Sequence, residues 1–323
     1  MREFAFTAPR DPAAARHALG RGERALAGGT NLVDLMKLEI ETPERVAFIG
    51  GIGLDRIEAD GEGLRIGALV ANSDCAADER VRRDWPLLAR AILAGASPQL
   101  RNKATTGGNL CQRTRCNYFY DRSQRCNKRE PGTGCDAIGG VNRMHAVIGT
   151  SERCIATYPG DMAVALYALD ATVEIDGPEG SRTVPVRQFH RLPGDTPERD
   201  NNLAQGELIT GVTLPAPLGG TQVYHKVRDR ASYAFALVSV AAAVRMEGGR
   251  IAHAAVALGS FGTIPWHEPA LDALLTGETP SRALFEKAAD LLVKDARGFG
   301  DNDFKIPLAR RTLIAALSQA TRI

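Results

Sequence analysis

The cysteines are the residues best suited to chemistry in this chain, and they are unevenly placed. Cys75 stands alone, whereas the other five fall within one stretch of 44 residues, 111–154: Cys111, Cys116, Cys126, Cys135 and Cys154. A chain of 323 residues buries a core that needs no disulfide staples. Four thiolates suffice to hold a [4Fe–4S] cluster or one zinc ion. The clustering therefore predicts a metal centre.

Several interpretations of these cysteines stay open on residue types alone. The paired C-x-x-C spacing typical of zinc ribbons is absent, which favours an iron–sulfur cluster over zinc. Disulfides would require an oxidising compartment, and inert buried thiols would not explain five cysteines in one segment. His145 and His190 could also be ligands, although such residues are more often ordinary hydrogen-bonded histidines. Basic residues outnumber acidic ones in this segment, which would favour thiolates and an anionic cluster.

Two glycine turns have the chemistry of a pyrophosphate site. Residues 27–31, Ala-Gly-Gly-Thr-Asn, lie between a predicted strand at Arg24–Ala27 and an amphipathic helix that starts at Leu32. Backbone N–H groups freed by such a turn bind phosphate oxygens at a helix amino terminus. Residues 105–109, Thr-Thr-Gly-Gly-Asn, repeat the pattern. Neither turn is G-x-G-x-x-G, so a Rossmann site is not indicated.

Hydrophobic periodicity and capping residues predict the elements around these turns. Asp11 can cap a helix over Pro12–Gly20, Ser73 can cap a short helix, and Pro86 opens a helix that ends near Gly95. Strands are predicted at Arg45–Ile49 and Leu64–Leu69. Residues 100–158 show little periodicity and are rich in Gly, Arg, Asn and Cys. Such a long irregular stretch is typical of a functional loop that is ordered by a ligand.

Regular patterns return after residue 158. A helix at Asp161–Leu169 is followed by strands at Ala171–Ile175, Arg182–Val186 and Leu208–Leu214, and the PAP segment at residues 215–217 marks a domain boundary. Antiparallel strands are predicted at Tyr224–Arg228, Val238–Met246 and Ile251–Leu258. Three helices complete the chain, at Pro269–Leu275, Pro280–Lys294 and Pro307–Thr321.

Three segments together resemble a known family. They are LAGGTNLVDLMK at residues 26–37, RNKATTGGNL at residues 101–110 and ATYPGDMAVALYALDA at residues 156–171. They are similar to the three FAD-binding segments of the flavoprotein subunit of the xanthine dehydrogenase and carbon monoxide dehydrogenase family. The resemblance covers nearly the whole chain. It implies an α+β fold with a two-subdomain FAD-binding domain of the PCMH/VAO type and a small α+β C-terminal domain of the carbon monoxide dehydrogenase flavoprotein type.

The resemblance also implies domain bounds and cofactor contacts. The FAD-binding domain would span residues 1–215, with subdomains of about 1–55 and 56–215 and an iron–sulfur insertion at about 110–156, and the C-terminal domain residues 216–323. The first segment would contact FAD through Leu26, Ala27, Gly28, Gly29, Thr30, Asn31 and Leu32. The opposite wall would be formed by Thr105, Thr106, Gly108 and Asn109.

Four later residues match positions nearer the flavin. Thr157 and Asp161 match positions at the ribityl chain and the flavin, and Leu208 and Lys226 match positions near the isoalloxazine. Without the resemblance, Asp161 is equally well interpreted as a helix N-cap and Lys226 as a solvated strand residue. No nucleophile–base pair or other catalytic constellation is apparent in the sequence. We therefore assign no catalytic residue.

The cysteine segment resembles one branch of the family. QRTRCNYFYDRSQRCNKREPGTGC at residues 112–135, followed by RCIATYPGD at residues 153–161, is similar to the cluster-carrying FAD subunit of the periplasmic aldehyde oxidoreductases. This implies a [4Fe–4S] cluster whose ligands are Cys116, Cys126, Cys135 and Cys154. Cys111 could replace one of them, but the resemblance places an apolar residue at that position. Tyr118, Phe119 and Tyr120 would shield the cluster from water.

The resemblance implies an electron-transfer subunit of a heterotrimer rather than a complete enzyme. A large subunit would carry the molybdenum cofactor and a small subunit the [2Fe–2S] clusters, and this chain's FAD would pass their electrons to an external acceptor. The first alternative is a self-sufficient FAD-dependent oxidase, and the second is a zinc-stabilised binding module without redox function. Either would differ from the main hypothesis in the cofactors that the isolated chain carries.

Composition and charge narrow the partners and the compartment. A formal charge of +2 gives no electrostatic basis for binding nucleic acid or a membrane surface. No apolar run reaches the ~20 residues that cross a bilayer, and the amino terminus lacks the pattern of an export signal. By resemblance we expect a periplasmic protein exported by a signal on a partner subunit. A cytoplasmic location is the alternative.

Overall fold

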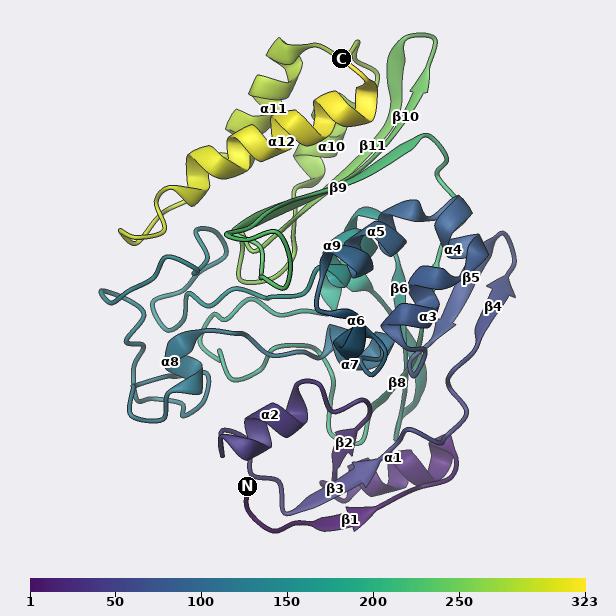
Figure 1. Ribbon diagram of the computed structural model, residues 1–323, viewed down its shortest axis with the longest axis vertical. Coiled ribbons are helices and arrows are strands. Elements are labelled where there is room, and N and C mark those ends of the chain that lie inside the picture. The colour runs from purple at the N-terminus through teal and green to yellow at the C-terminus, as the bar shows by residue number, and fades with distance from the viewer.

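The computed structural model describes residues 1–323, and its elements form three successive units along the chain (Figure 1). The first unit is a three-stranded parallel sheet in the order β1-β3-β2 with a helix against it. Asp11 Oδ1 accepts a hydrogen bond from the Ala14 N–H at 2.8 Å, which confirms the predicted cap of the first helix. The elements of this unit are β1 (Ala5–Thr7), α1 (Pro12–Gly20), β2 (Arg24–Leu26), α2 (Leu32–Lys37) and β3 (Arg45–Phe48).

The second unit is a five-stranded antiparallel sheet in the order β4-β5-β8-β6-β7. Its central strand β8 pairs with β5 and β6, so segments far apart in sequence meet there. The strands are β4 (Ile57–Asp60), β5 (Gly63–Gly67), β6 (Thr172–Gly177), β7 (Gly180–Pro185) and β8 (Leu208–Leu214). The helices are α3 (Asn72–Ala77), α4 (Glu79–Asp84), α5 (Pro86–Ala94), α6 (Pro98–Arg101), α7 (Thr106–Leu110), α9 (Met162–Ala168) and the 3-10 turn η1 (Val186–Gln188).

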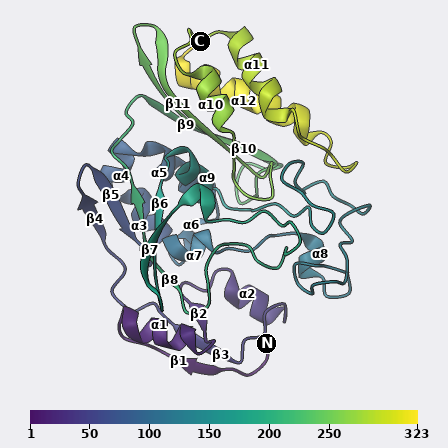
Figure 2. The same ribbon diagram turned by 180° about the vertical axis from the view of Figure 1, so that it is seen from behind.

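The third unit is a four-stranded antiparallel sheet covered by helices, in the order β12-β11-β10-β9 (Figures 1 and 2). Its strands are β9 (Thr221–Val227), β10 (Val238–Glu247), β11 (Arg250–Gly259) and β12 (Trp266–His267). Its helices are α10 (Pro269–Leu275), α11 (Arg282–Val293) and α12 (Lys305–Thr321). The predicted α10 has the bounds observed, and the other predicted helices and strands of this unit agree within a few residues.

The sheet of the third unit is buried on both faces, which explains its small apolar residues. Val240, Ala242 and Val244 of β10 belong to a hydrophobic cluster shared with α11 and α12. Ala241 and Ala243, which alternate with them, join a cluster of 35 buried residues that includes α5 and α9 of the second unit. Because successive strand residues point to opposite faces, β10 contributes to two cores at once.

The segment between α7 and α9 has little regular structure, as expected from its lack of periodicity. We call residues 110–156 the insert; only α8 (Asn117–Tyr120) is helical within it. The insert lies beside α2 of the first unit (Figures 1 and 2). Phe119 is fully buried there, in a cluster with Leu35 of α2 and Cys126. The irregular segment is therefore packed onto the protein rather than extended into solvent.

Some local predictions were wrong. Ser73 does not cap α3, because the helix already begins at Asn72 and Ala71 occupies the N-cap position. Asp161 lies at the N-cap position of α9 but makes no capping hydrogen bond. The strands β1, β4 and β12 were not predicted; each has four residues or fewer and is defined by its partner strand.

Candidate functional site

A cavity of about 600 Å³ separates the first unit from the second. This volume lies in the range of pockets that bind cofactor-sized ligands. We call it the large cavity. The turn at residues 27–31 lies along one wall, and Thr105, Gly107 and Gly108 of the second turn lie along another, with the start of β8 nearby. The two predicted glycine turns therefore face the same space.

Close backbone packing brings the two turns together. A Cβ atom built on Gly28 would overlap the carbonyl oxygen of Lys103, just before the second turn, so only glycine fits at that position. Gly29 adopts φ +73°, a left-handed conformation that glycine tolerates without strain. The Gly107 N–H donates to the Ala68 carbonyl at 2.8 Å, which fixes the second turn to the end of β5. Glycine is therefore needed at position 28 because of close backbone packing, and it is favoured at position 29 by the backbone conformation.

The cavity offers hydrogen-bond donors suited to an anionic ligand. The Asn31 Nδ2 amide is buried without a partner, while its Oδ1 accepts from the Arg113 backbone N–H at 2.9 Å. This nitrogen is closed to solvent, so it does not face the open part of the cavity. The helices α2 and α7 have only six and five residues. The N–H groups of the turns, rather than long helix dipoles, therefore provide most of the attraction.

Most of the residues predicted to contact FAD line this cavity. They are Leu26, Ala27, Gly28, Gly29, Thr30, Asn31, Leu32, Thr105, Gly108 and Leu208. Thr106 and Asn109 lie behind the second turn and support it. Thr106 Oγ1 donates to the Val70 carbonyl at 3.1 Å, and Asn109 Nδ2 donates to Asn72 Oδ1 at 2.7 Å. Thr157 lines a different, smaller cavity.

Asp161 and Lys226 form a buried ion pair outside the lining of the large cavity. Lys226 Nζ lies 2.8 Å from Asp161 Oδ2, and their side chains are 5% and 10% exposed. Tyr224 donates to the other carboxylate oxygen of Asp161 at 2.6 Å. The pair joins α9 of the second unit to β9 of the third. Its contact with a flavin therefore stays a prediction, whereas its contact between the two units is observed.

A charged network that the sequence did not reveal links the large cavity to the insert. Arg113 Nε lies 2.8 Å from Asp200 Oδ2, and its Nη1 lies 3.2 Å from Glu41. Lys128 Nζ binds the other Asp200 oxygen at 2.6 Å. Burial alone would raise the pKa of Asp200, but Lys128 and Arg113 together hold it below its usual value. These residues come from four separate segments, so no local pattern could have indicated them.

The four cysteines predicted as ligands line one small cavity inside the insert. Cys116, Cys126, Cys135 and Cys154 surround a space of about 10 Å³, which we call the thiol cavity. Cys126 and Cys135 face each other across an isolated antiparallel bridge, held by the Asn127 N–H donating to the Gly134 carbonyl at 2.7 Å. No three His, Cys, Asp or Glu side chains are arranged to hold a single metal ion. The thiols therefore converge without forming a single-ion site.

The remaining cysteines lie elsewhere. Cys111 lines the large cavity and is absent from the lining of the thiol cavity. Cys75 is fully buried in the core of the second unit, where burial raises the pKa of its thiol to about 12. Cys75 is therefore a core residue, whereas the packing role of Cys111, which borders the large cavity, stays a prediction.

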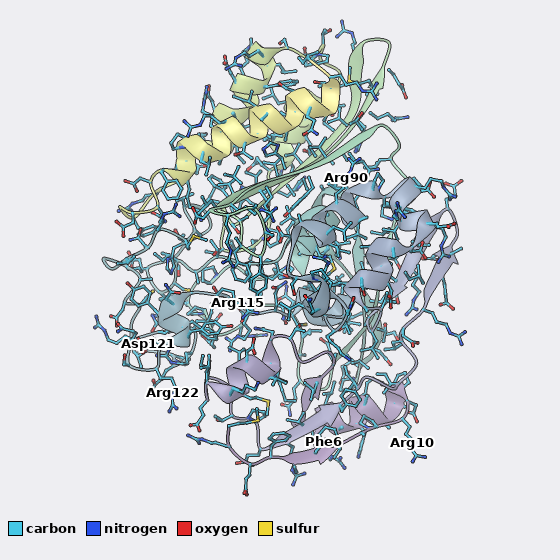
Figure 3. The ribbon with its side chains drawn as sticks, in the orientation of Figure 1. Phe6, Arg10, Arg90, Arg115, Asp121 and Arg122 are labelled. Carbon is cyan, nitrogen blue, oxygen red and sulfur yellow. The ribbon has the colours of Figure 1, made fainter.

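The positive charge expected around the thiols is largely neutralised. Arg122 pairs with Glu39 at 3.1 Å, and Arg143 with Asp229 at 2.9 Å, using carboxylates from outside the insert. Figure 3 shows Arg122 at the outer edge of the molecule and Arg115 further inward. Burial dominates instead and raises the pKa of Cys116 to about 12 and that of Cys154 to about 11. Lys128 lowers the pKa of Cys154 as expected of a basic neighbour, but burial has the larger effect on that thiol.

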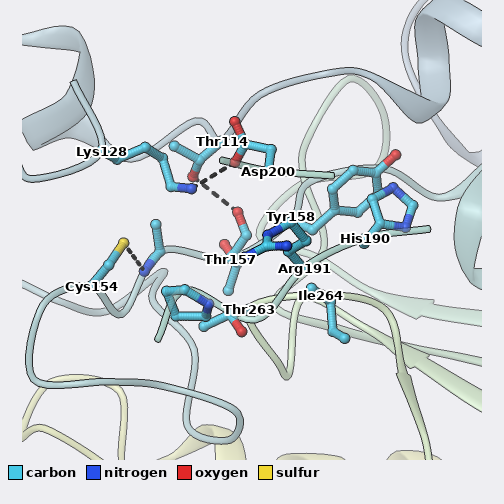
Figure 4. A pocket seen from close by; sticks show the side chains of 12 residues that line it. Thr114, Lys128, Cys154, Thr157, Tyr158, His190, Arg191, Asp200, Thr263 and Ile264 are labelled. Carbon is cyan, nitrogen blue, oxygen red and sulfur yellow. Dashed lines mark hydrogen bonds and ion pairs between the residues drawn. The ribbon is translucent and has the colours of Figure 1, made fainter. Parts of the chain in front are cut away.

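A third cavity, of about 20 Å³, lies between the network and the thiols. Its lining includes Lys128, Asp200, Cys154 and His190, and Figure 4 shows Lys128 and Asp200 paired at its edge. This is enough room for about one water molecule. His190 is held by the Leu110 carbonyl at 3.0 Å and by the Tyr167 hydroxyl at 3.2 Å. It is a hydrogen-bonded core histidine, and it does not line the thiol cavity.

Comparison with known proteins accounts for this arrangement. Residues 2–217 match the family model "FAD binding domain in molybdopterin dehydrogenase", and residues 222–320 match "CO dehydrogenase flavoprotein C-terminal domain". The chain belongs to the FAD-binding medium subunits of the molybdenum hydroxylase family. Its cofactor is FAD, and this medium subunit is part of an oxidoreductase. The predicted family and fold class are thereby confirmed.

The similarity to individual proteins extends over nearly the whole chain. The aldehyde oxidoreductase FAD-binding subunit PaoB of Escherichia coli is 54% identical, with 99% of each chain covered. The carbon monoxide dehydrogenase medium chain of Afipia carboxidovorans is 25% identical over 94% of this chain and 90% of its own. A solved structure of carbon monoxide dehydrogenase from Hydrogenophaga pseudoflava superposes with a TM-score of 0.78 at 26% identity, covering 99% of this chain and 97% of that one. None of the helices here has the length and apolar character needed to cross a bilayer.

Proposed function

We propose that this medium subunit binds one FAD in the large cavity and one [4Fe–4S] cluster in the thiol cavity. It would pass electrons from the [2Fe–2S] clusters of a partner subunit to an external acceptor, within a molybdenum-containing aldehyde oxidoreductase. The observation that carries this proposal is the convergence of Cys116, Cys126, Cys135 and Cys154 on one cavity beside the FAD site. The resemblance to PaoB, whose name gives an FAD-binding subunit of an aldehyde oxidoreductase, supports the substrate class.

The residues of the large cavity fit the parts of FAD. The N–H groups of the turn at residues 27–31 would hold the pyrophosphate, and the turn at residues 105–109 would close the opposite side. Leu208, at the start of β8, would contact the flavin. FAD supplies one- and two-electron redox chemistry when it is bound. The protein contributes position and hydrogen bonds, and it excludes water from one face of the cofactor.

The donor set of the thiol cavity fits a four-iron cluster. Four sulfur ligands, with no carboxylate in the lining, are the coordination that such clusters require. The thiols must lose their protons on binding, so uptake of the cluster offsets the burial that now raises their pKa.

Arg113 connects the two sites physically. Its side chain lines the large cavity, stacks on the Phe119 ring at 4.8 Å and donates to the Lys128 carbonyl at 3.3 Å. Phe119 and Lys128 both line the thiol cavity. The side chains of Arg113 and Phe119 would therefore lie in series between the two cofactors. A separation of about two side chains suits electron exchange between them.

The proposal extends to partners, compartment and domain bounds. We propose a heterotrimer with a molybdenum-cofactor large subunit and a [2Fe–2S] small subunit, supported by the description of several relatives as medium chains. We propose a periplasmic location with export directed by a partner, which rests on the resemblance of the cysteine segment. The proposed FAD-binding domain ends near residue 215, close to where the two family matches meet.

Replacement of single cysteines tests the cluster assignment. Cys126→Ser or Cys135→Ser should lower the iron bound after anaerobic reconstitution and make the insert more sensitive to proteolysis, because each removes one ligand. Cys75→Ser and Cys111→Ser are matched controls that should keep the iron content of the native protein. The amount of bound iron and the rate of proteolytic cleavage of the insert would be measured on the same samples. Equal iron content in all four variants would refute the assignment.

A further inference from the structure

One histidine of the insert contacts a proposed cluster ligand. His145 Nε2 lies 3.1 Å from Cys116 Sγ, and the side chain is largely buried. Its Nδ1 atom is also buried and has no hydrogen-bond partner. A neutral imidazole carries one N–H, and a sulfur that is bound to iron can only accept a hydrogen bond. With its hydrogen on Nε2, His145 would be a donor aimed at that sulfur.

The backbone around His145 is held by the third unit as well as by hydrogen bonds within the insert. Asn302, just before α12, donates from Nδ2 to the carbonyls of His145 and Ala146 at 3.3 and 3.0 Å. The Asn302 N–H donates to Asn142 Oδ1 at 3.2 Å, and Asn142 Nδ2 donates to the Phe299 carbonyl at 2.8 Å. Asn302 is fully buried. These bonds fix residues 142–146 against the C-terminal helix.

Lys305 adds an unusual tether at the same place. Its side chain is completely buried, and its Nζ donates to the carbonyls of His145, Met144 and Ser260 at 2.9, 3.2 and 2.6 Å. No carboxylate pairs with it, since Lys305 takes part in none of the ion pairs of the chain. A lysine so deeply buried without a carboxylate partner is unusual, and its Nζ is surrounded by three carbonyl oxygens. Such a residue calls for a role beyond packing.

We propose that His145 donates a hydrogen bond to the Cys116 ligand of the cluster, and that Lys305 is the positioning residue that holds His145 there. The C-terminal unit would thereby set the reduction potential of a cluster bound in the FAD-binding unit. Reduction adds one electron, supplied by the partner's clusters, and so increases the negative charge on the sulfurs. A hydrogen bond to a ligand sulfur stabilises the reduced form more than the oxidised form and raises the potential. This inference rests on the proposed cluster.

The test measures the midpoint potential of the cluster in the reconstituted full chain by a redox titration followed by electron paramagnetic resonance. His145→Leu should keep the iron content but lower the potential, with about a three- to tenfold smaller ratio of reduced to oxidised cluster at a fixed applied potential. His145→Gln, whose amide can donate, should recover part of this shift. His267→Gln is the matched control, because His267 is a part-buried histidine paired with Asp272, away from the thiols. It should leave the potential unchanged.

A variant of Lys305 tests whether this residue acts on the cluster by positioning His145. Lys305→Met should shift the potential in the same direction as His145→Leu, and the double variant should show no further shift, because Lys305 acts through His145. Asn302→Ala tests the same carbonyls if Lys305→Met does not fold. Full iron content with an unchanged potential in His145→Leu would overturn the inference alone, as would additive shifts in the double variant. A native chain that takes up no iron would overturn the proposed function together with the inference.

Discussion

The large cavity and the thiol cavity are built in opposite ways. The large cavity, of about 600 Å³, is framed by turns anchored to the ends of β2 and β5. The thiol cavity, of about 10 Å³, is formed by loops with a single helical turn and is nearly closed. The large cavity therefore depends on backbone packing between two turns, and the thiol cavity depends on four side chains carried by loops.

The largest effect should follow from breaking the backbone contact that shapes the large cavity. In Gly28→Ala the new methyl group would overlap the Lys103 carbonyl, so the two turns must separate. We expect FAD affinity to fall by about 100-fold or more, and stability by about 2–4 kcal/mol. Flavin fluorescence titration and chemical denaturation would measure these changes.

Gly51→Ala is the matched control for that variant. Gly51 has no atom within 4 Å of an added Cβ and is exposed, so the same substitution should change stability by less than about 0.5 kcal/mol. Iron content should change little in either variant, because the thiol cavity does not include these glycines. A Gly28→Ala protein with native FAD affinity would contradict the claim that the contact between Gly28 and Lys103 shapes the FAD site.

A smaller effect, shared by both sites, is expected from Asp200→Asn. Asp200 forms ion pairs with Arg113 and with Lys128, and its side chain is 22% exposed. Removing its charge leaves the buried Lys128 without an ionic partner, whereas Arg113 keeps Glu41 at 3.2 Å; we expect a cost of about 2–3 kcal/mol after allowance for partial exposure. Both FAD retention and iron uptake should decrease. Asp195→Asn, which removes the partner of Arg153 at a 90% exposed position, should change little.

The pH dependence of stability provides an independent check on Asp200. Its pKa is lower in the folded protein than in the unfolded chain, where it is about 3.9. The stabilisation is therefore fully present above about pH 4 and is lost as the pH falls through the folded pKa. Denaturation curves of Asp200→Asn should depend less on pH below about 4 than those of the native protein. Parallel acid profiles for the two proteins would count against this role of Asp200.

The contrast between the two sites also explains what could be predicted from the sequence. The glycine turns and the cysteine segment are local patterns, so their residues could be assigned to two sites and the structure brings each set together. The helix α10 was placed correctly because Pro269 and its apolar spacing are local signals. Three short strands were missed because their pairing depends on partners distant in sequence.

Residues that act across segments could not be predicted. The network of Glu41, Arg113, Lys128 and Asp200 unites four separate stretches of chain. The contact of His145 with Cys116, and its support by Lys305, depends on how α12 meets the insert. Asp161 was expected at the flavin or as a helix cap, yet it binds Lys226 between two units. In each case the tertiary partner decides the role of the side chain.

The most direct test is the cofactor content of the isolated chain. The purified protein would be reconstituted anaerobically with FAD, iron and sulfide, then analysed for flavin, iron and visible absorption. The account predicts one FAD and about four iron atoms per chain, with flavin bands overlaid on the broad absorption of a cluster. A protein that remained free of iron, or that bound a single zinc ion at the four cysteines, would contradict it.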